Sequence, residues 1–287
     1  MSNRLIGYQS GQGFLYDLSG ASKMLFFILV SVACMATYDP RFILAVGLLS
    51  IYLFYLAKIR WRDISFVVKI IGSIALFNLL MVYLFAPGYG EEIYGAKTVL
   101  IEGWGRFYLT SQELFYLANL LLKYFSTVPL AILFLMTTHP SQFAASLNQI
   151  GIPYKFAYSV SLTLRYIPDV QEEFFTIRKA QEARGLDLSQ KAGLVKRIRG
   201  NLQIVLPLIF SSLERIDTIS TAMELRRFGR YKKRTWYVHK SLMKQDYLVI
   251  VSAILLLGIS IGLIFLNHGR FYNPWGGYSW LLVKVCY

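Results

Sequence analysis

Cysteine and histidine are scarce in this chain, and their scarcity argues against several kinds of chemistry. The 287 residues include 2 cysteines and 3 histidines. Cys34 lies within an apolar stretch and Cys286 next to the C-terminal residue, so we expect no disulfide framework. His139, His239 and His268 fall in separate connecting segments, with no H-x-x-x-H pair and no paired intramembrane carboxylates. We therefore expect neither a metal centre nor an acid–base site, and predict that the chain is not an enzyme.

Signals for nucleotide binding, nucleic-acid binding and secretion are also missing. The glycine-rich residues 7–13 lack the lysine and the strand context of a G-x-x-x-x-G-K-[ST] motif, so we expect no directly bound ATP or other cofactor. Acidic residues number 16 against 30 Lys and Arg, but no recognition module accompanies this charge, so no nucleic-acid partner is expected. Asp17 precedes the first apolar run and no A-x-A site follows it, which argues against a secretory signal.

Apolar residues, in contrast, are abundant, at 55% of the chain with a mean hydropathy of +0.47. A run of about 20 apolar residues is long enough to cross the hydrocarbon core of a membrane. The turn-forming sequence Asp39-Pro40-Arg41 divides the first apolar region into a tight helical hairpin. We therefore predict an all-α membrane protein with about five transmembrane helices, at residues 24–38, 42–57, 64–86, 114–138 and 247–266.

Charge asymmetry predicts the orientation of these spans. Lys58, Arg60 and Arg62 mark the second connection as cytoplasmic, because positive charge gathers on that side. Residues 87–112 carry a net negative charge and are expected outside, whereas residues 139–245 carry 18 Lys and Arg against 8 acidic residues. The chain is thus predicted to be a multi-pass protein of a bacterial-type plasma membrane, with its N-terminus in the cytoplasm and anionic lipid as a partner of its basic face.

Three regions follow from this topology. Residues 1–138 are expected to form an N-terminal transmembrane domain of about four spans. Residues 139–245 are expected to form a cytoplasmic module. Residues 246–287 are expected to contain the last transmembrane helix and an extracellular tail.

The cytoplasmic region is predicted to hold two long amphipathic helices. Apolar residues recur at spacings of three and four from Phe156 to Ile177 and again from Ile198 to Met223. Each helix contains an internal proline, and Pro153 suits the first turn of the first helix. Gly185 is expected to end that helix, with residues 186–196 as a connector.

A seven-residue phrase closes each of these helices. Residues 180–186 read AQEARGL and residues 222–228 read AMELRRF, so both copies share the pattern Ala, any residue, Glu, small or apolar, Arg. The helix dipole alone favours one arginine near a helix C-terminus. Two matched copies indicate a duplicated binding feature, because a guanidinium group can bind a partner's carboxylate with two parallel hydrogen bonds.

These motifs resemble the transmembrane T component (EcfT/CbiQ-like) of energy-coupling factor (ECF) type ABC transporters. That family has a pair of Ala-Arg-Gly motifs at the ends of two crossed cytoplasmic coupling helices. The first copy matches it completely, whereas the second keeps only its central arginine, and Arg227 competes with Arg226 for that role. The resemblance implies that the ATPase-docking residues are Ala183, Arg184, Gly185, Leu225, Arg226 and Arg227.

The resemblance also implies partners and a function. Two ABC ATPase subunits would bind the arginines at the two helix ends, which we call the arginine tips, and would themselves bind the ATP. Their motion would pass to a small membrane substrate-binding S component, for uptake of a vitamin, its precursor or a metal ion. An exposed apolar patch on the crossed helices is expected to hold the S component. The residues expected in this patch are Val160, Leu164, Ile209 and Leu213.

Two other kinds of membrane protein are alternatives. A conventional ABC importer permease would couple through one compact cytoplasmic loop rather than two long helices. Another membrane transport or scaffold protein is the second alternative, but a channel or secondary transporter would need polar groups in its spans, and these are few. We expect the polar residues Lys69, Asn78, Asn119 and Lys123 to mediate helix packing instead.

Overall fold

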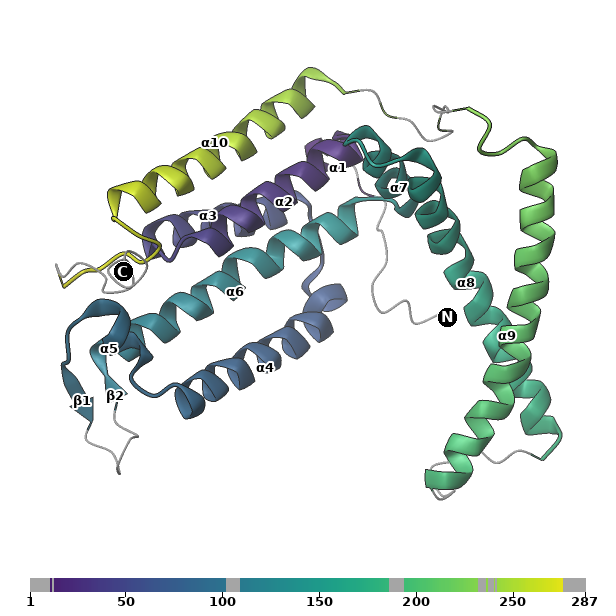
Figure 1. Ribbon diagram of the computed structural model, residues 1–287, viewed down its shortest axis with the longest axis horizontal. Helices are drawn as coiled ribbons and strands as arrows, with labels where there is room; N and C mark the ends of the chain where they lie inside the picture. The colour runs from purple at the N-terminus through teal and green to yellow at the C-terminus, as the bar shows by residue number, and fades with distance from the viewer. Residues whose placement is uncertain are drawn as a thin grey trace, which may run out of the picture. The chain divides into compact units, whose positions relative to one another are not determined.

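The computed structural model describes residues 11, 13–101, 109–185, 194–231, 236, 240 and 242–275, without the side chains of residues 63, 194–197 and 199. Cys286, His239 and most of the predicted connector lie outside the described residues. The chain forms two compact units, one made of Met1–His139 with Lys240–Tyr287 and the other of Pro140–His239, and each is described by itself (Figure 1). We call the first the membrane unit and the second, after its two long helices, the two-helix unit.

The membrane unit is helical apart from one short hairpin. Its elements are α1 (Phe14–Asp17), α2 (Gly20–Ala36), α3 (Pro40–Leu56), α4 (Trp61–Phe85), α5 (Tyr89–Tyr94), β1 (Val99–Ile101), β2 (Leu109–Thr110), α6 (Ser111–Thr137) and α10 (Lys244–Leu266). Helix α6 packs against α2, α3, α4 and α5, and α10 packs against α2 (Figure 1). The predicted all-α membrane fold is therefore confirmed.

Three of the described helices are long and apolar enough to cross a membrane, namely Ile64–Phe85 within α4, α6 and α10. Helices α2 and α3 are also apolar but have 17 residues each. The predicted hairpin between them is confirmed. Asp39 caps α3 by accepting a hydrogen bond from the Arg41 backbone N–H at 3.0 Å, and Pro40 occupies the first helical position.

Helix α2 begins at Gly20, four residues before the predicted apolar span that starts at Met24. The reason is a buried polar contact with α10. The Asp246 carboxylate accepts hydrogen bonds from the Ser19 backbone N–H at 2.8 Å and from the Ser22 hydroxyl at 2.6 Å. These bonds satisfy polar groups at the start of α2, so the helix extends beyond its apolar run.

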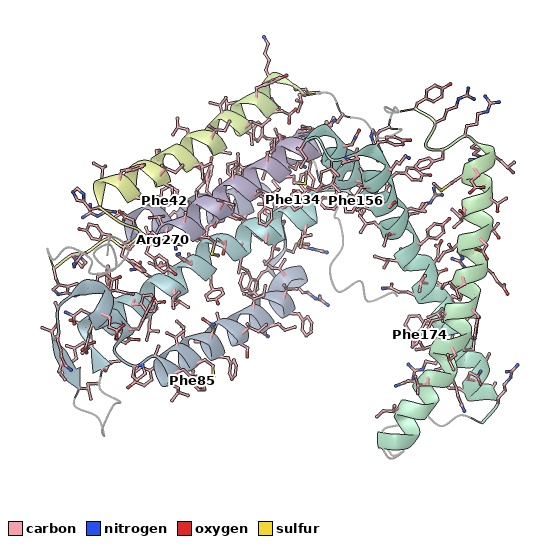
Figure 2. The ribbon with its side chains drawn as sticks, viewed as in Figure 1. Phe42, Phe85, Phe134, Phe156, Phe174 and Arg270 are labelled. Carbon is pink, nitrogen blue, oxygen red and sulfur yellow. The ribbon has the colours of Figure 1, made fainter. Side chains whose placement is uncertain are left out.

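The core of the membrane unit is apolar. Its buried members are Val30, Ala33, Cys34, Phe42, Val46, Leu130 and Ala253, drawn from α2, α3, α6 and α10. Phe134 stacks on Phe27 with ring centroids 5.5 Å apart. Figure 2 shows Phe42 within this bundle and Phe85 at the end of α4, where its side chain is 83% exposed. The exposed apolar side chains of α4 suit contact with lipid.

Two buried lysines hold α2 and α6 together. The Lys23 ammonium of α2 donates to the Thr137 carbonyl at the C-terminus of α6 over 2.9 Å. The Lys123 ammonium of α6 donates to the Met35 carbonyl at the C-terminus of α2 over 3.1 Å. Each lysine thus binds a carbonyl that has no partner within its own helix, at the negative end of the helix dipole. Lys123 and Asn119 are 4% and 1% exposed, as the predicted role in helix packing requires, whereas Lys69 of α4 is exposed and the packing role predicted for it is wrong.

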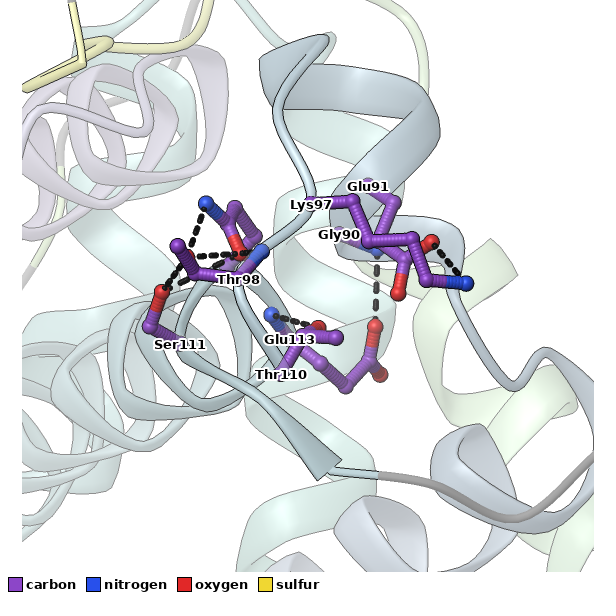
Figure 3. Close-up of polar contacts among 8 residues, drawn as sticks. Gly90, Glu91, Lys97, Thr98, Thr110, Ser111 and Glu113 are labelled. Atoms are coloured by element: carbon purple, nitrogen blue, oxygen red, sulfur yellow. Dashed lines mark hydrogen bonds and ion pairs between the residues drawn. The ribbon is translucent and has the colours of Figure 1, made fainter. Parts of the chain in front are cut away.

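The connection between α4 and α6 contains α5 and the β1–β2 hairpin, which the sequence pattern did not predict. Figure 3 shows how polar contacts fold it over the start of α6. The Glu113 carboxylate accepts a hydrogen bond from the Gly90 backbone N–H at 2.7 Å, and the Gln112 side-chain oxygen accepts one from the Thr98 N–H at 3.1 Å. Tyr94 is buried there, and its burial raises the pKa of its hydroxyl to about 12.

Candidate functional site

The two long helices of the two-helix unit are α8 (Tyr154–Ala183) and α9 (Leu194–Leu225), and the short helix α7 (Pro140–Gln149) precedes them. A tight turn joins α7 to α8, with Gly151 at a φ of 103° and the Ile152 N–H donating to the Leu147 carbonyl at 3.0 Å. Two predicted boundaries are wrong, the first by one residue and the second by three. Pro153 is the N-cap of α8 rather than its first helical residue, and α9 already begins at Leu194, inside the predicted connector.

The first arginine motif forms the C-terminus of α8. Ala183 is the last helical residue, and Arg184 is the C-cap. Gly185 follows at a φ of 88°, and its N–H donates to the Glu182 carbonyl at 3.0 Å. This left-handed conformation suits glycine because it has no Cβ. The predicted role of Gly185 in ending the helix is confirmed.

The second motif forms the C-terminus of α9 with the same backbone geometry. Leu225 is the last helical residue, and Arg227 takes the left-handed position with a φ of 53°. The Arg227 N–H donates to the Glu224 carbonyl at 2.8 Å and the Phe228 N–H to the Met223 carbonyl at 2.9 Å, which is the Schellman pattern of a helix end.

The two ends can therefore be matched residue by residue. Arg226 corresponds to Arg184, since both directly follow the last helical residue, and Arg227 corresponds to Gly185, since both have positive φ. Arg184 and Arg226 are exposed, and neither forms an ion pair within the described part of the chain. Glu182 pairs instead with Arg178 at 2.9 Å.

The two arginine ends lie at opposite ends of α8. Phe228, the last residue of the second phrase, packs against Tyr154 and Tyr158 near the start of α8, with centroid distances of 5.7 and 4.7 Å. The first motif lies at the other end of that helix. Helices α8 and α9 thus run in opposite directions along each other and cross (Figure 1).

A polar cluster lies where α8 and α9 cross, and no motif in the sequence drew attention to it. The Glu173 carboxylate of α8 binds Arg215 Nη2 of α9 at 2.9 Å and also accepts a short hydrogen bond from the Ser211 hydroxyl. Arg215 Nη1 lies 4.0 Å from Asp169 Oδ2, and its guanidinium lies 5.8 Å from the centre of the Tyr166 ring. An available signal was the repeat itself, because Glu173 and Arg215 lie at the same distance before the two arginine motifs.

The residues expected in the apolar patch are distributed over both helices. Val160 and Leu164 of α8 are half-buried, whereas Ile209 and Leu213 of α9 are 48% and 50% exposed. Few of the side chains that the structure describes in this unit are fully enclosed, among them Ala157 and Ile204 at 0%. Figure 2 shows Phe156 near the start of α8, where it is 59% exposed, and Phe174 further along the same helix. The described helices thus leave wide apolar surfaces uncovered.

Together these features define a class of protein. It is a helical membrane protein whose second unit is a crossed pair of long helices with matched arginine ends. Among the described residues, no group of three or more His, Cys, Asp or Glu side chains could hold a metal ion.

The chain belongs to the CbiQ family, described as cobalt transport protein, whose sequence profile matches residues 12–237. Similar proteins include three that are named energy-coupling factor transporter transmembrane protein EcfT. The one from Streptococcus equi subsp. equi is 26% identical over 89% of this chain and 95% of its own length. The one from Thermanaerovibrio acidaminovorans is 27% identical over 88% and 92%, and the one from Exiguobacterium sibiricum 28% over 90% and 97%. The family resemblance stated from the sequence is thus confirmed. The chain is therefore a membrane protein of a transport family.

Proposed function

We propose that this chain is the non-catalytic transmembrane coupling subunit of an ECF-type ABC importer. Its arginine tips bind two ABC ATPase subunits, which bind the ATP, and its crossed helices pass their motion to a substrate-binding S component. The imported substrate is a vitamin, its precursor or a metal ion. The N-terminus and the two-helix unit lie on the cytoplasmic side of the plasma membrane, as the positive charge of residues 139–245 favours.

The observation that carries this proposal is the equivalence of Arg184 and Arg226. Both are exposed at the same position of a helix end, where the dipole favours a cation. Arg184 follows Glu173, at the crossing of the two helices, by eleven residues, and Arg226 follows Arg215 by eleven. Eleven helical residues correspond to a rise of about 16 Å. The two tips can therefore be up to about 33 Å apart, which suits two separate ATPases better than two contacts on one.

The apolar surface supports the second part of the proposal. Val160, Leu164, Ile209 and Leu213 offer aliphatic side chains that no described residue covers fully. Apolar packing has no fixed direction, so a membrane partner could tilt on this surface during the transport cycle without breaking a network of ion pairs. We assign these residues to S-component contact on that ground.

The test is co-purification of the tagged chain from membranes that contain all the candidate partners. The unchanged chain is expected to retain two nucleotide-binding subunits and one small membrane protein. Replacing Arg184 and Arg226 together by Glu is expected to cost about 2–5 kcal/mol per docking pair and to lower ATPase retention about 30-fold or more. Retention of both ATPases by this variant, with ATP hydrolysis still coupled to uptake, would contradict the docking assignment.

A matched control makes the same change of charge elsewhere. Lys179 lies about one turn before the first tip and Arg230 just after the second, and both are exposed. The Lys179→Glu, Arg230→Glu variant is expected to retain the ATPases nearly as well as the unchanged chain. An equal loss in both double variants would mean that net charge, rather than the two matched arginines, holds the ATPases.

A further inference from the structure

The repeat that places the two arginines also relates the residues at the crossing. The phrases begin at Ala180 and Ala222, and the same offset relates Glu173 to Arg215 and Asp169 to Ser211. If each residue is replaced by its equivalent on the other helix, one of the two observed contacts becomes the other. Glu173 of α8 contacts Ser211 of α9, and Asp169 of α8 faces Arg215 of α9. Two equivalent helices that make reciprocal contacts of this kind are related by an approximate two-fold axis.

This axis passes through the Glu173–Arg215 contact, because Glu173 and Arg215 are equivalent residues of the two helices and contact each other. Two identical charged residues at such a point would repel each other. The chain instead places a carboxylate on α8 and a guanidinium on α9, with Nη2 of Arg215 at 2.9 Å from Glu173. Arg215 also directs Nη1 towards Asp169, so one guanidinium faces two carboxylates of the other helix. The contact is only partly exposed, with side-chain exposures of 36% for Arg215 and 20% for Glu173.

The segments between the crossing and the tips are equal in length and uninterrupted. Arg184 follows Glu173 by eleven residues, and Arg226 follows Arg215 by eleven. Neither segment contains proline or glycine, so both are regular helix up to the motif. The internal prolines, Pro168 and Pro207, both precede the crossing, where each removes one backbone hydrogen bond and makes its helix easier to bend.

We propose that Glu173 and Arg215 are positioning residues that form a central pivot. They hold α8 and α9 at one crossing point. Displacement of one arginine tip is therefore passed to the other through two stiff helical segments of equal length, residues 174–184 and 216–226, which we call the arms. The bending occurs in the proline-containing segments before the crossing. The role of the tips rests on the proposed function, but the pivot itself is a property of this chain alone and can be measured without any partner.

The measurement is the distance between spin labels on the two arms, by pulsed electron paramagnetic resonance on the purified full chain. Lys179 and Thr221 are exposed and equivalent under the repeat, so cysteines there report on both arms after Cys34 and Cys286 have been replaced by serine. We expect a narrow distance distribution in this background. Glu173→Gln or Arg215→Gln is expected to widen it at least twofold, Arg215→Glu to widen it most, and Arg215→Lys to widen it least.

The matched control is Arg178→Gln, which removes the ion pair to Glu182 within α8 and leaves the crossing intact. Its distribution is expected to be unchanged. Wild-type width in both Glu173→Gln and Arg215→Gln would overturn the proposal. Equal widening in Arg178→Gln would also overturn it, because any lost ion pair would then have the same effect.

A variant that exchanges the contact residues between the two helices tests the proposal even if the single variants do not fold. Asp169→Ser, Glu173→Arg, Ser211→Asp and Arg215→Glu together move each contact partner to its equivalent position on the other helix. An approximate two-fold axis predicts that this variant recovers the narrow distribution, and a wide distribution would reject the axis and the pivot.

In the assembled transporter, the pivot variants are expected to keep the ATPases and to hydrolyse ATP while importing several-fold less substrate per ATP. An unchanged ratio would reject the role of the pivot in coupling. If the Arg184→Glu, Arg226→Glu chain keeps its ATPases and the pivot variants still widen the distribution, the proposed docking fails while the pivot stands.

Discussion

The membrane unit and the two-helix unit bury their side chains in different ways. In the membrane unit an apolar core runs through four helices, and its buried polar groups, Lys23, Lys123 and Asp246 among them, bind backbone atoms of neighbouring elements. In the two-helix unit, few of the described side chains are enclosed, and the helices meet through partly exposed contacts such as Glu173–Arg215. The first unit is organised as a packed interior, whereas the second offers long surfaces to other proteins.

This difference predicts that mutations in the membrane unit affect stability, whereas mutations on the two-helix unit affect binding. Buried polar groups in a packed interior are costly to lose, because their partners are then left without hydrogen bonds. Exposed residues on a two-helix surface contribute little to stability, so their substitution should be felt in binding. The following predictions test that contrast.

The largest expected effect on stability is that of Asp246→Ala in α10. The carboxylate accepts hydrogen bonds from the backbone N–H groups of Ser19 and Met243 and from the Ser22 hydroxyl, all at the start of α2 or α10. Removing it leaves buried donors unpaired, at a cost of about 2–5 kcal/mol. Thermal unfolding in detergent should show a clearly lower midpoint. Asp217→Ala, at an exposed site of α9, is the control and should change stability by less than about 0.5 kcal/mol.

A charge introduced on the apolar surface of α9 should separate binding from stability. Leu213 is 50% exposed, so Leu213→Asp should leave the midpoint of unfolding nearly unchanged. It should release the S component, at a cost of about 2–3 kcal/mol of binding, while both ATPases remain bound. Thr218→Asp adds the same charge at an exposed polar site and should retain the S component. Simultaneous loss of the S component and the ATPases from Leu213→Asp would contradict a separate contact surface.

A pair of Gly→Ala changes compares two positions within the membrane unit. A Cβ at Gly90 would lie 2.6 Å from the Glu113 backbone nitrogen, so Gly90→Ala forces α5 away from α6. The expected cost is about 1–3 kcal/mol, measured by thermal unfolding. Gly72 in α4 has open space around it, and Gly72→Ala should stabilise the helix by up to about 1 kcal/mol. Equal effects of the two changes would show that the contact in Figure 3 does not fix the loop.

Much of this architecture could be predicted from local sequence signals. Runs of about 20 apolar residues indicated α4, α6 and α10, Asp39-Pro40 indicated the hairpin, and three–four spacing indicated α8 and α9. The helix ends at the arginines followed from the repeated phrase and from Gly185.

Features that depend on distant partners could not be predicted in this way. The early start of α2 depends on Asp246, which lies more than two hundred residues away in sequence. Helix α5 is held by Glu113 of α6, and Lys123 binds a carbonyl of α2. The Glu173–Arg215 contact was not predicted, because equivalent positions in the repeat do not imply contact and only the crossing of the helices brings the two side chains together.

The smallest expected effect concerns Arg227, the residue that departs from the first motif. A non-glycine residue at a φ of 53° is strained by roughly 1 kcal/mol. Arg227→Gly should relieve that strain and raise the midpoint of unfolding slightly. It should also leave ATPase retention unchanged, because Arg226, and not Arg227, occupies the position equivalent to Arg184.

Arg226→Gly is the informative counterpart, since it removes the same charge from the neighbouring position. It relieves no strain, because Arg226 does not have positive φ, and it adds a flexible residue at the helix end. We therefore expect slightly lower stability together with loss of one ATPase contact. If Arg227→Gly instead lost the ATPase while Arg226→Gly kept it, the second tip would present its left-handed residue to the partner, and the two ends would match in backbone geometry but not in function.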